Sequence, residues 1–417
     1  MTAGNTIRSL ALSTPDDPNV DDLGDGIEAT RLIPDVHMIP GLWKIDGYSG
    51  LRARLQNALE LEPNRNLFDF PYDWRRDNRV SARKLQRLSH SWLKNWRQTS
   101  GNDEAKLILV GHSMGGLVAR YFLEVLGGWS DTRALITFGT PYRGSLNAVG
   151  YLANGYAKSI GPLTLDFSET LRSFTAVYQL LPAFECIDTG DGHLKRVSEA
   201  GPLPNIDTAR AVESLKFYRE MKDAQEANAK LDAYRMQKYE IYPIVGVEQP
   251  TFQSAECRAG KLSLLRTIKG EDESGDGTVP RLSATPLELT DAHRETYMAE
   301  AHASLQNWEP ALVQLTGILT GQDIDTGLFS YGIETGLSLD LDDVYSASAI
   351  QIRASISNAA RVSATITDPT GAEKMSVPLA PSEGGLWTGT VSLPPGPYRV
   401  TAKGEGANPV TDVIFAI

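Results

Sequence analysis

The 417-residue chain has few cysteines, no excess of basic charge and no long apolar run. Its two cysteines, Cys186 and Cys257, are too few for a disulfide framework in a chain of this length, although they leave room for one bridge. Lys and Arg number 40 and Asp and Glu 52, and the net charge of −12 argues against a nucleic-acid partner, which requires a basic surface. No run reaches the roughly 18 apolar residues of a membrane span. The composition therefore indicates a globular protein that does not bind nucleic acid.

Residues 1–26 form an acidic N-terminal segment that includes Asp16-Asp17-Pro18-Asn19-Val20-Asp21-Asp22. A secretory signal needs an apolar central stretch, and this segment has none. We therefore expect a cytoplasmic protein if Met1 is the true start of the chain. If the N-terminus is truncated, we expect a secreted one.

Segments typical of strands and helices alternate after this N-terminal segment. We expect helices at 51–61, 82–96 and 305–319, and strands at 67–71, 106–110, 135–139 and 241–246. Alternation of this kind predicts a mostly parallel sheet covered on both faces. Residues 27–325 are the expected extent of this α/β domain.

A stretch without strand signals interrupts the alternation at about residues 146–238. Its clearest feature is a mixture of charged and apolar residues at helical spacing from Ala209 to Gln237. We expect a helical cap inserted into the α/β domain.

The pattern changes again after Gly321, and residues 333–417 predict a second domain. Apolar and polar residues alternate in short stretches that are separated by Pro- and Gly-rich turns, at 348–357, 361–368, 386–393 and 398–403. Short strands at such intervals predict a β-sandwich of immunoglobulin-like shape. Because no cluster of catalytic residue types occurs here, we expect a structural or adhesive role and a protein partner for this domain.

The segment Gly111-His112-Ser113-Met114-Gly115-Gly116 joins a strand to a helix. A buried strand leads into it, and apolar residues recur at helical spacing from Met114 to Leu126. Strand, sharp turn and helix make up a nucleophile elbow, in which the small glycines allow the close packing of the turn. Ser113 is therefore the candidate nucleophile, and the backbone N–H of Met114 is the candidate donor to an oxyanion.

A nucleophilic serine needs a histidine base and a carboxylate that orients this histidine. In proteins with such an elbow, the acid and then the histidine follow the serine in the chain. Of the later histidines His193, His293 and His302, we favour His302, which precedes the final helix of the domain; the charged surroundings of His293 indicate a solvated face. Asp276, flanked by two glycines, is the candidate acid. Gly190-Asp191-Gly192 is interpreted as an ordinary turn.

Neither a metal nor a cofactor is expected. No His-x-x-x-His pair, cysteine pair or calcium-loop spacing occurs in the sequence.

Several motifs, taken in order, resemble the lecithin:cholesterol acyltransferase family of lipases, which have the α/β-hydrolase fold. They are Pro71-Tyr72-Asp73-Trp74-Arg75, the elbow, Phe138-Gly139-Thr140-Pro141-Tyr142-Arg143-Gly144-Ser145, Val177-Tyr178-Gln179-Leu180-Leu181-Pro182, Gly275-Asp276-Gly277-Thr278-Val279-Pro280 and His302. The resemblance spans about residues 27–320, and the Tyr-Asp-Trp-Arg segment is its most specific part. It implies a lipid or acyl-ester substrate, a Ser113, Asp276 and His302 triad, and substrate contacts by Tyr72 and Trp74. The alternative is structural, with Trp74 in the core and Arg75 in an ion pair.

One family feature has no counterpart at the expected place. Members of the family usually begin with a strand and a Pro-Gly loop that supplies the second oxyanion donor. Here only polar and acidic residues precede the matching region, so either the chain is truncated or Ile39-Pro40-Gly41-Leu42 takes over the loop. Without that strand, we expect the central sheet to have an unpaired edge.

These motifs predict a serine esterase, lipase or O-acyltransferase that acts on lipid acyl esters through an acyl-enzyme on Ser113. The cap is expected to contact a membrane surface transiently. One alternative is an inactive hydrolase fold that serves as a binding or scaffold protein. The other is an enzyme that deacylates a glycolipid or a lipoprotein.

Overall fold

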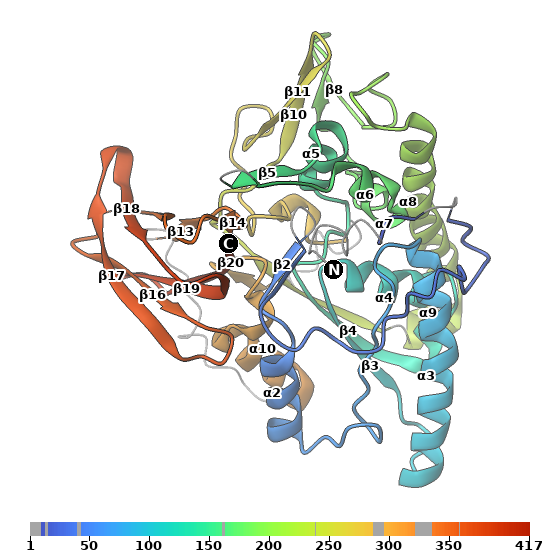
Figure 1. The fold of residues 1–417 in the computed structure, drawn as a ribbon. Coiled ribbons are helices and arrows are strands. Elements are labelled where there is room, and N and C mark those ends of the chain that lie inside the picture. The colour runs from blue at the N-terminus through green and yellow to red at the C-terminus, as the bar shows by residue number, and fades with distance from the viewer. Residues whose placement is uncertain are drawn as a thin grey trace.

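Two β-rich parts lie side by side in the computed structural model of the chain, as Figure 1 shows. One is a parallel sheet with helices on its faces, and the other, coloured orange to red, is an antiparallel β-sandwich. The structure describes residues 10–12, 16–39, 43–160, 163–237, 239–286, 296–321, 336–357 and 359–417.

The parallel sheet has four strands in the order β12-β9-β4-β3. Its strands are β3 (Leu107–His112), β4 (Thr132–Phe138), β9 (Glu240–Gly246) and β12 (Thr296–Met298). Successive side chains of a strand point to opposite faces, so Leu135 packs with helices on one face and Ile136 with helices on the other. This confirms the α/β architecture.

Two pairs of helices cover the two faces. The pair α3 (Asn78–Ser100) and α4 (Met114–Glu124) packs with Leu135 and Ile241, whereas α2 (Ser49–Leu59) and α10 (Glu309–Thr320) pack with Ile136 and Ile244. Short 3₁₀ helices are η1 (Gly128–Asp131), η2 (Arg281–Ser283), η4 (Leu305–Asn307) and η7 (Glu383–Gly385). No helix in the described ranges has both the length and the apolar character of a membrane span.

Strand β3 lies at one edge of the sheet. Among the described strands it pairs with β4 alone, and Ile108 is 37% exposed. The expected strand at 67–71 is wrong, because only a single bridge between Pro63 and Leu67 occurs there. A strand requires a neighbour for its backbone groups, and no described strand lies beside this segment.

The cap contains more than helices. Its helices are α5 (Leu146–Asn154), α6 (Ser168–Ser173), α7 (Thr175–Tyr178), α8 (Thr208–Asn228) and α9 (Asp232–Gln237). Its strands are β5 (Ala157–Ile160), β6 (Leu163–Asp166), β7 (Ile187–Asp188) and β8 (Leu194–Lys195), and β7 also pairs with β10 (Ser254–Arg258), which continues into β11 (Lys261–Leu265).

The absence of strands expected for residues 146–238 is therefore wrong, because strands of two to four residues are too short to show an alternating pattern. The helical stretch expected at 209–237 is present and consists of two helices, α8 and α9. The Asn228 amide donates to the carbonyl and carboxylate of Glu124 at 3.0 and 2.9 Å, so tertiary contacts fix the end of α8.

The acidic segment packs against arginines that surround the start of α3. Asp25 pairs with Arg75 at 2.9 Å and Asp16 with Arg76 at 2.9 Å. A short hairpin follows, formed by β1 (His37–Ile39) and β2 (Trp43–Ile45).

The C-terminal part is built from strands that alternate buried and exposed residues. They are β13 (Leu337–Asp340), β14 (Val344–Tyr345), β15 (Ile350–Ile356), β16 (Val362–Thr367), β17 (Glu373–Pro381), β18 (Leu386–Val391), β19 (Gly396–Gly404) and β20 (Val410–Ala416). Strand β17 pairs with both β16 and β18 and so joins the two layers around one apolar core. This confirms the predicted β-sandwich.

Candidate active site

Ser113 occupies the sharp turn between β3 and α4. Its φ of 53° and ψ of −129° lie in a region that non-glycine residues rarely adopt, and the surrounding contacts hold it there. Its N–H donates to the Phe138 carbonyl at 2.9 Å, and its carbonyl accepts from Thr140 Oγ1 at 2.9 Å. A Cβ on Gly111 would lie 2.9 Å from the Gly116 nitrogen, which explains the need for glycine in this turn.

His302 lies in the loop between β12 and η4 and reaches the serine directly. Its Nε2 is 2.9 Å from Ser113 Oγ, and its Nδ1 is 2.6 Å from Asp276 Oδ2. The imidazole is buried, with 6% of the residue exposed. The structure thus brings together the three residues predicted from the sequence.

The Asp276 carboxylate is fixed by its own loop. Its Oδ1 accepts from the backbone N–H groups of Thr278 at 2.9 Å and Val279 at 2.6 Å, which leaves Oδ2 for the histidine. The Asp276 carbonyl also accepts from the His302 N–H at 2.8 Å, so the loops of acid and histidine are tied at two points. This arrangement favours the tautomer with the proton on Nδ1, which leaves Nε2 free to accept the serine proton.

Gly139, directly after β4, gives the acid and the histidine room to meet. A Cβ at this position would lie 2.7 Å from Asp276 Oδ2 and 2.8 Å from His302 Nδ1, and the φ of Gly139 is +53°. Glycine is therefore required at the end of β4 by the hydrogen bond itself.

His112 and Tyr48 support the histidine from behind, which sequence reasoning missed. The Nε2 of His112 is 3.0 Å from the His302 carbonyl, and its Nδ1 is 3.2 Å from the Tyr48 hydroxyl. Burial, followed by the neighbouring His302, lowers the pKa of His112 to about 3, so its ring stays neutral beside His302. The only signal in the sequence was the position of His112 next to the serine.

A cavity of about 330 Å³ opens at Ser113. Its lining includes Ser113, Met114, His112 and His302, together with the aromatic side chains of Tyr48, Phe70, Tyr72 and Trp74. Residues 28–33, which follow the acidic segment, also line it. Their role was missed because no motif marks them.

Two groups in this cavity are suited to binding an oxyanion. Met114 begins α4, so its N–H is one of the donors that the helix itself leaves free. The Tyr72 hydroxyl lies beside the same turn, 3.8 Å from the position that a Cβ on Gly115 would take. Burial raises the pKa of Tyr72, which keeps its hydroxyl protonated and able to donate.

Trp74 and Arg75 were predicted either to contact the substrate or to have a structural role. Trp74 lines the cavity and also packs edge-on against Phe174 of the cap, with ring centroids 5.4 Å apart. Arg75 is 1% exposed and pairs with Asp73 at 2.6 Å as well as with Asp25. Arg75 thus has a structural role, because its ion pairs connect the acidic N-terminal segment to the Tyr-Asp-Trp-Arg segment.

The competing candidates lie elsewhere. Asp191 and His193 are exposed in the turn between β7 and β8. His293 and the residues 40–42 of the alternative oxyanion loop lie outside the described residues. Within the described ranges, no group of three or more His, Cys, Asp or Glu side chains is arranged to hold a metal ion.

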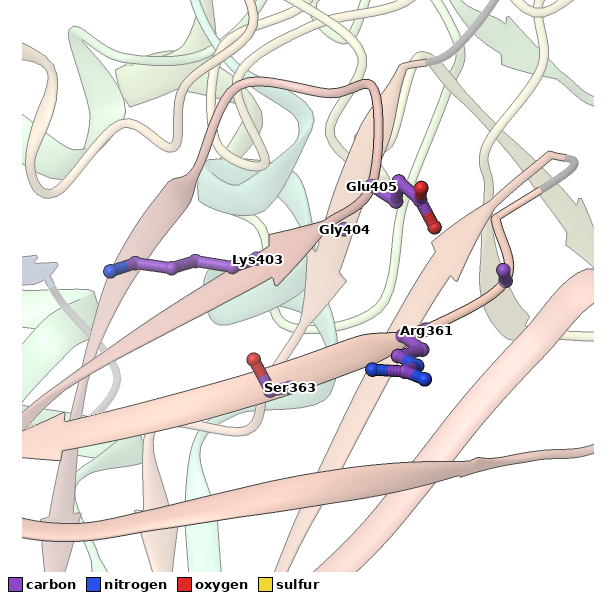
Figure 2. Close-up of a pocket in the computed structure, with 6 residues that line it drawn as sticks. Arg361, Ser363, Lys403, Gly404 and Glu405 are labelled. Atoms are coloured by element: carbon purple, nitrogen blue, oxygen red, sulfur yellow. The ribbon is translucent and has the colours of Figure 1, made fainter.

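A second hollow, of about 490 Å³, lies on the sandwich and is open to solvent (Figure 2). Arg361 and Ser363 line it from the start of β16, and Lys403 and Glu405 from the end of β19. It contains charged residues but neither a histidine nor a cysteine.

Comparison with known proteins identifies the family. The family described as lecithin:cholesterol acyltransferase matches residues 43–307, well over half of the 417 residues. The chain belongs to this family. The matched residues lie within the α/β part of the chain.

The solved structures that this chain matches include a lipase. A chain of the Tle4–Tli4 complex is 17% identical over 59% of this chain and 66% of that chain, just under two thirds of its length, with a TM-score of 0.41. The mature lipase BlEst2 of Bacillus licheniformis is 17% identical over 58% of this chain and 74% of that chain, with a TM-score of 0.30. Among curated proteins, the sequence has no significant match.

Proposed function

We propose that the protein is a serine hydrolase or acyltransferase that cleaves lipid acyl esters through an acyl-enzyme on Ser113. The observation that carries this proposal is the unbroken chain of hydrogen bonds from Ser113 through His302 to Asp276 at a cavity of about 330 Å³. The family supports a lipase or acyltransferase chemistry, and the aromatic walls suit an acyl chain.

In the first half of the reaction, Ser113 Oγ attacks the ester carbonyl while His302 Nε2 takes the serine proton. Asp276 stabilises the imidazolium that forms. The carbonyl oxygen gains negative charge as the bond to Ser113 forms, and the Met114 N–H and the Tyr72 hydroxyl donate to it. His302 then returns the proton to the leaving alcohol, and the acyl group stays on Ser113.

In the second half, a hydroxyl compound attacks the acyl-enzyme. His302 removes its proton as it adds to the carbonyl carbon and gives this proton to Ser113 Oγ as the ester bond to the enzyme breaks. If water is the attacking group, the product is a free acid; if an alcohol attacks, the product is a new ester. Hydrolase and transferase therefore share every residue named so far.

Labelling with a fluorophosphonate tests this proposal. We expect Ser113 to be the modified residue in the intact protein, and we expect Ser113→Ala and His302→Gln to abolish both labelling and the release of fatty acid from an acyl ester. A panel of phospholipid, glycolipid and lipopeptide esters then distinguishes a phospholipid substrate from the other two classes. Absence of labelling in a folded protein would support the scaffold alternative instead.

A further inference from the structure

The face that the sandwich turns toward the α/β domain meets the two loops that carry Asp276 and His302. Strands β13 and β20 lie on this face, whereas β17 and β18 lie on the far side (Figure 1). We infer that the sandwich is a positioning part of the active site, which holds the acid and histidine loops through β13 and β20. This inference rests on the proposed function of Ser113, Asp276 and His302.

Strand β20 holds the histidine loop on both sides of His302. Two residues before it, Glu300 Oε1 accepts from the Thr411 N–H of β20 at 2.8 Å and from the Ala301 N–H at 2.8 Å. Two residues after it, Ser304 Oγ donates to the Thr411 carbonyl. One residue of the sandwich thus uses its backbone donor and acceptor to fix both ends of a five-residue stretch centred on His302.

Strand β13 holds the acid loop through Gln249, which is 4% exposed. The side-chain amide of Gln249 donates to the Leu337 carbonyl at 3.2 Å and accepts from the Leu339 N–H at 3.0 Å. The backbone N–H of Gln249 donates to the Gly275 carbonyl at 2.9 Å, and Gln249 forms a parallel bridge with Asp276. Gln249 therefore connects the sandwich to the backbone of the acid.

Apolar side chains also pack at the contact between the sandwich and the histidine loop. Ala301 is 4% exposed and belongs to the core of the sandwich, although it lies in the histidine loop. Ala303 forms a small buried cluster with Val413 of β20 and Val36. His302 is thus flanked on each side by an alanine that is buried with sandwich residues.

The polar groups at this contact are buried, so the position of the loops depends on the hydrogen bonds that these groups make. Glu300 is fully buried, and burial raises the pKa of its carboxyl well above the usual range, although the N–H groups of Ala301 and Thr411 act to lower it. A buried polar group that loses its partner is costly, and the loop would have to move to find another. A displacement of about 1 Å at a catalytic group can lower a rate about 100-fold.

Point variants of the full chain test the inference. Glu300→Ala removes one hydrogen bond to the sandwich and Gln249→Leu removes two, whereas Ser304→Ala is a milder variant that keeps the packing. We expect kcat and the rate of fluorophosphonate labelling to fall about 10-fold or more, with KM changed less than about two-fold. Glu300→Gln keeps the acceptor oxygen, so we expect it to restore most of the rate.

The low-field proton resonance of the His302 Nδ1–H gives a second measurement that does not depend on turnover. We expect it to shift or broaden in Glu300→Ala and Gln249→Leu at temperatures where circular dichroism shows a folded protein. Arg361→Ala and Lys403→Ala serve as matched controls, because these exposed residues lie on the same sandwich at the hollow of Figure 2. Both controls should behave as the wild type.

Three outcomes would overturn the inference. The first is a wild-type kcat and an unchanged resonance in folded Glu300→Ala, Gln249→Leu and Ser304→Ala. The second is an equal loss of kcat in Glu300→Gln and Glu300→Ala. The third is an equal loss of kcat in the two control variants. Failure of the proposed function looks different, because the wild-type protein itself would then resist the fluorophosphonate.

Discussion

Tyr72 lines the cavity, and its hydroxyl lies beside the first turn of α4. In the proposed reaction the Met114 N–H supplies one hydrogen bond to the oxyanion, and enzymes of this chemistry generally use at least two. The position of the Tyr72 hydroxyl suits the second, which links the family-specific Tyr-Asp-Trp-Arg segment to the chemistry.

We expect Tyr72→Phe to lower kcat about 100-fold with little change in KM, because the donor acts on charge that develops only in the transition state. Steady-state kinetics on a soluble acyl ester measure this. Tyr398→Phe is the control, since Tyr398 is a buried tyrosine of the sandwich whose hydroxyl donates to the Pro394 carbonyl at 2.9 Å. Equal activity of Tyr72→Phe and the wild type would assign oxyanion binding to another group.

His112 should make the stability of the protein depend on pH. Its native pKa is lowered to about 3, whereas a histidine in the unfolded chain has a pKa of about 6.5. Between these values the unfolded state binds a proton that the native state does not, so stability is greatest above the unfolded pKa and falls as the pH falls.

We expect His112→Gln to remove this contribution, because an amide can donate to the His302 carbonyl but does not titrate. Urea unfolding at about pH 7.5 and about pH 5 measures it, and the free energy of unfolding of the wild type should fall by up to about 1.4 kcal/mol more per pH unit than that of the variant. Parallel pH dependences would show that His112 binds its proton as readily in the native state as in the unfolded state.

Among the elements, β3 combines the nucleophile with an exposed strand edge. Its outer backbone groups have no partner strand among those described, and Ile108 adds apolar surface next to them. Such an edge can pair with another chain, which makes it a site of aggregation.

Ile108→Thr keeps the β-branched shape and removes much of the apolar surface. We expect it to reduce aggregation at high protein concentration, as measured by light scattering, and to change the free energy of unfolding by less than about 1 kcal/mol. Ile136→Thr is the contrasting variant. Ile136 is fully buried on the neighbouring strand, so this substitution should destabilise the protein strongly. Unchanged aggregation of Ile108→Thr would show that this edge is protected.

The elbow was predictable because strand, turn and helix are each encoded locally between Leu107 and Glu124. Asp276 and His302 were predictable from residue type and chain order, and the structure brings them into contact with each other and with Ser113. By contrast, the strand expected at 67–71 depended on a neighbour, and the strands of the cap were too short to show a pattern.

The contacts of Glu300 and Gln249 could not be predicted at all. Both are polar residues in ordinary surroundings, and their partners lie about 90 to 110 residues later in the sequence. Only the folded chain shows that the sandwich, which was expected to be a structural or adhesive module, meets the catalytic loops.

At the scale of the whole molecule, ion pairs connect the sandwich to the β1–β2 hairpin and the residues after it. Lys44 pairs with Asp412, and Arg399 pairs with Asp46. Although burial acts to lower it, the carboxylates of Asp412 and Asp343 raise the pKa of Lys44, so the amine stays charged. Asp412 is 4% exposed, which makes it dependent on this partner.

We expect Lys44→Met to lower the free energy of unfolding by about 3 to 5 kcal/mol, because it leaves a buried carboxylate without its counter-charge. The double variant Lys44→Met, Asp412→Asn should recover much of this loss, since no buried charge remains. Chemical denaturation of the single and double variants measures both effects. A double variant as unstable as Lys44→Met would show that the loss comes from packing rather than from charge.

The position of Thr411 late in the sequence has a consequence for biosynthesis. A ribosome produces the chain from its N-terminus, so Ser113, Asp276 and His302 all leave the exit tunnel before β20 exists. If β20 holds the histidine loop as inferred, the nascent polypeptide has its nucleophile but not yet an ordered base. Acyl transfer would then begin only after β20 has been synthesised and has paired with the histidine loop.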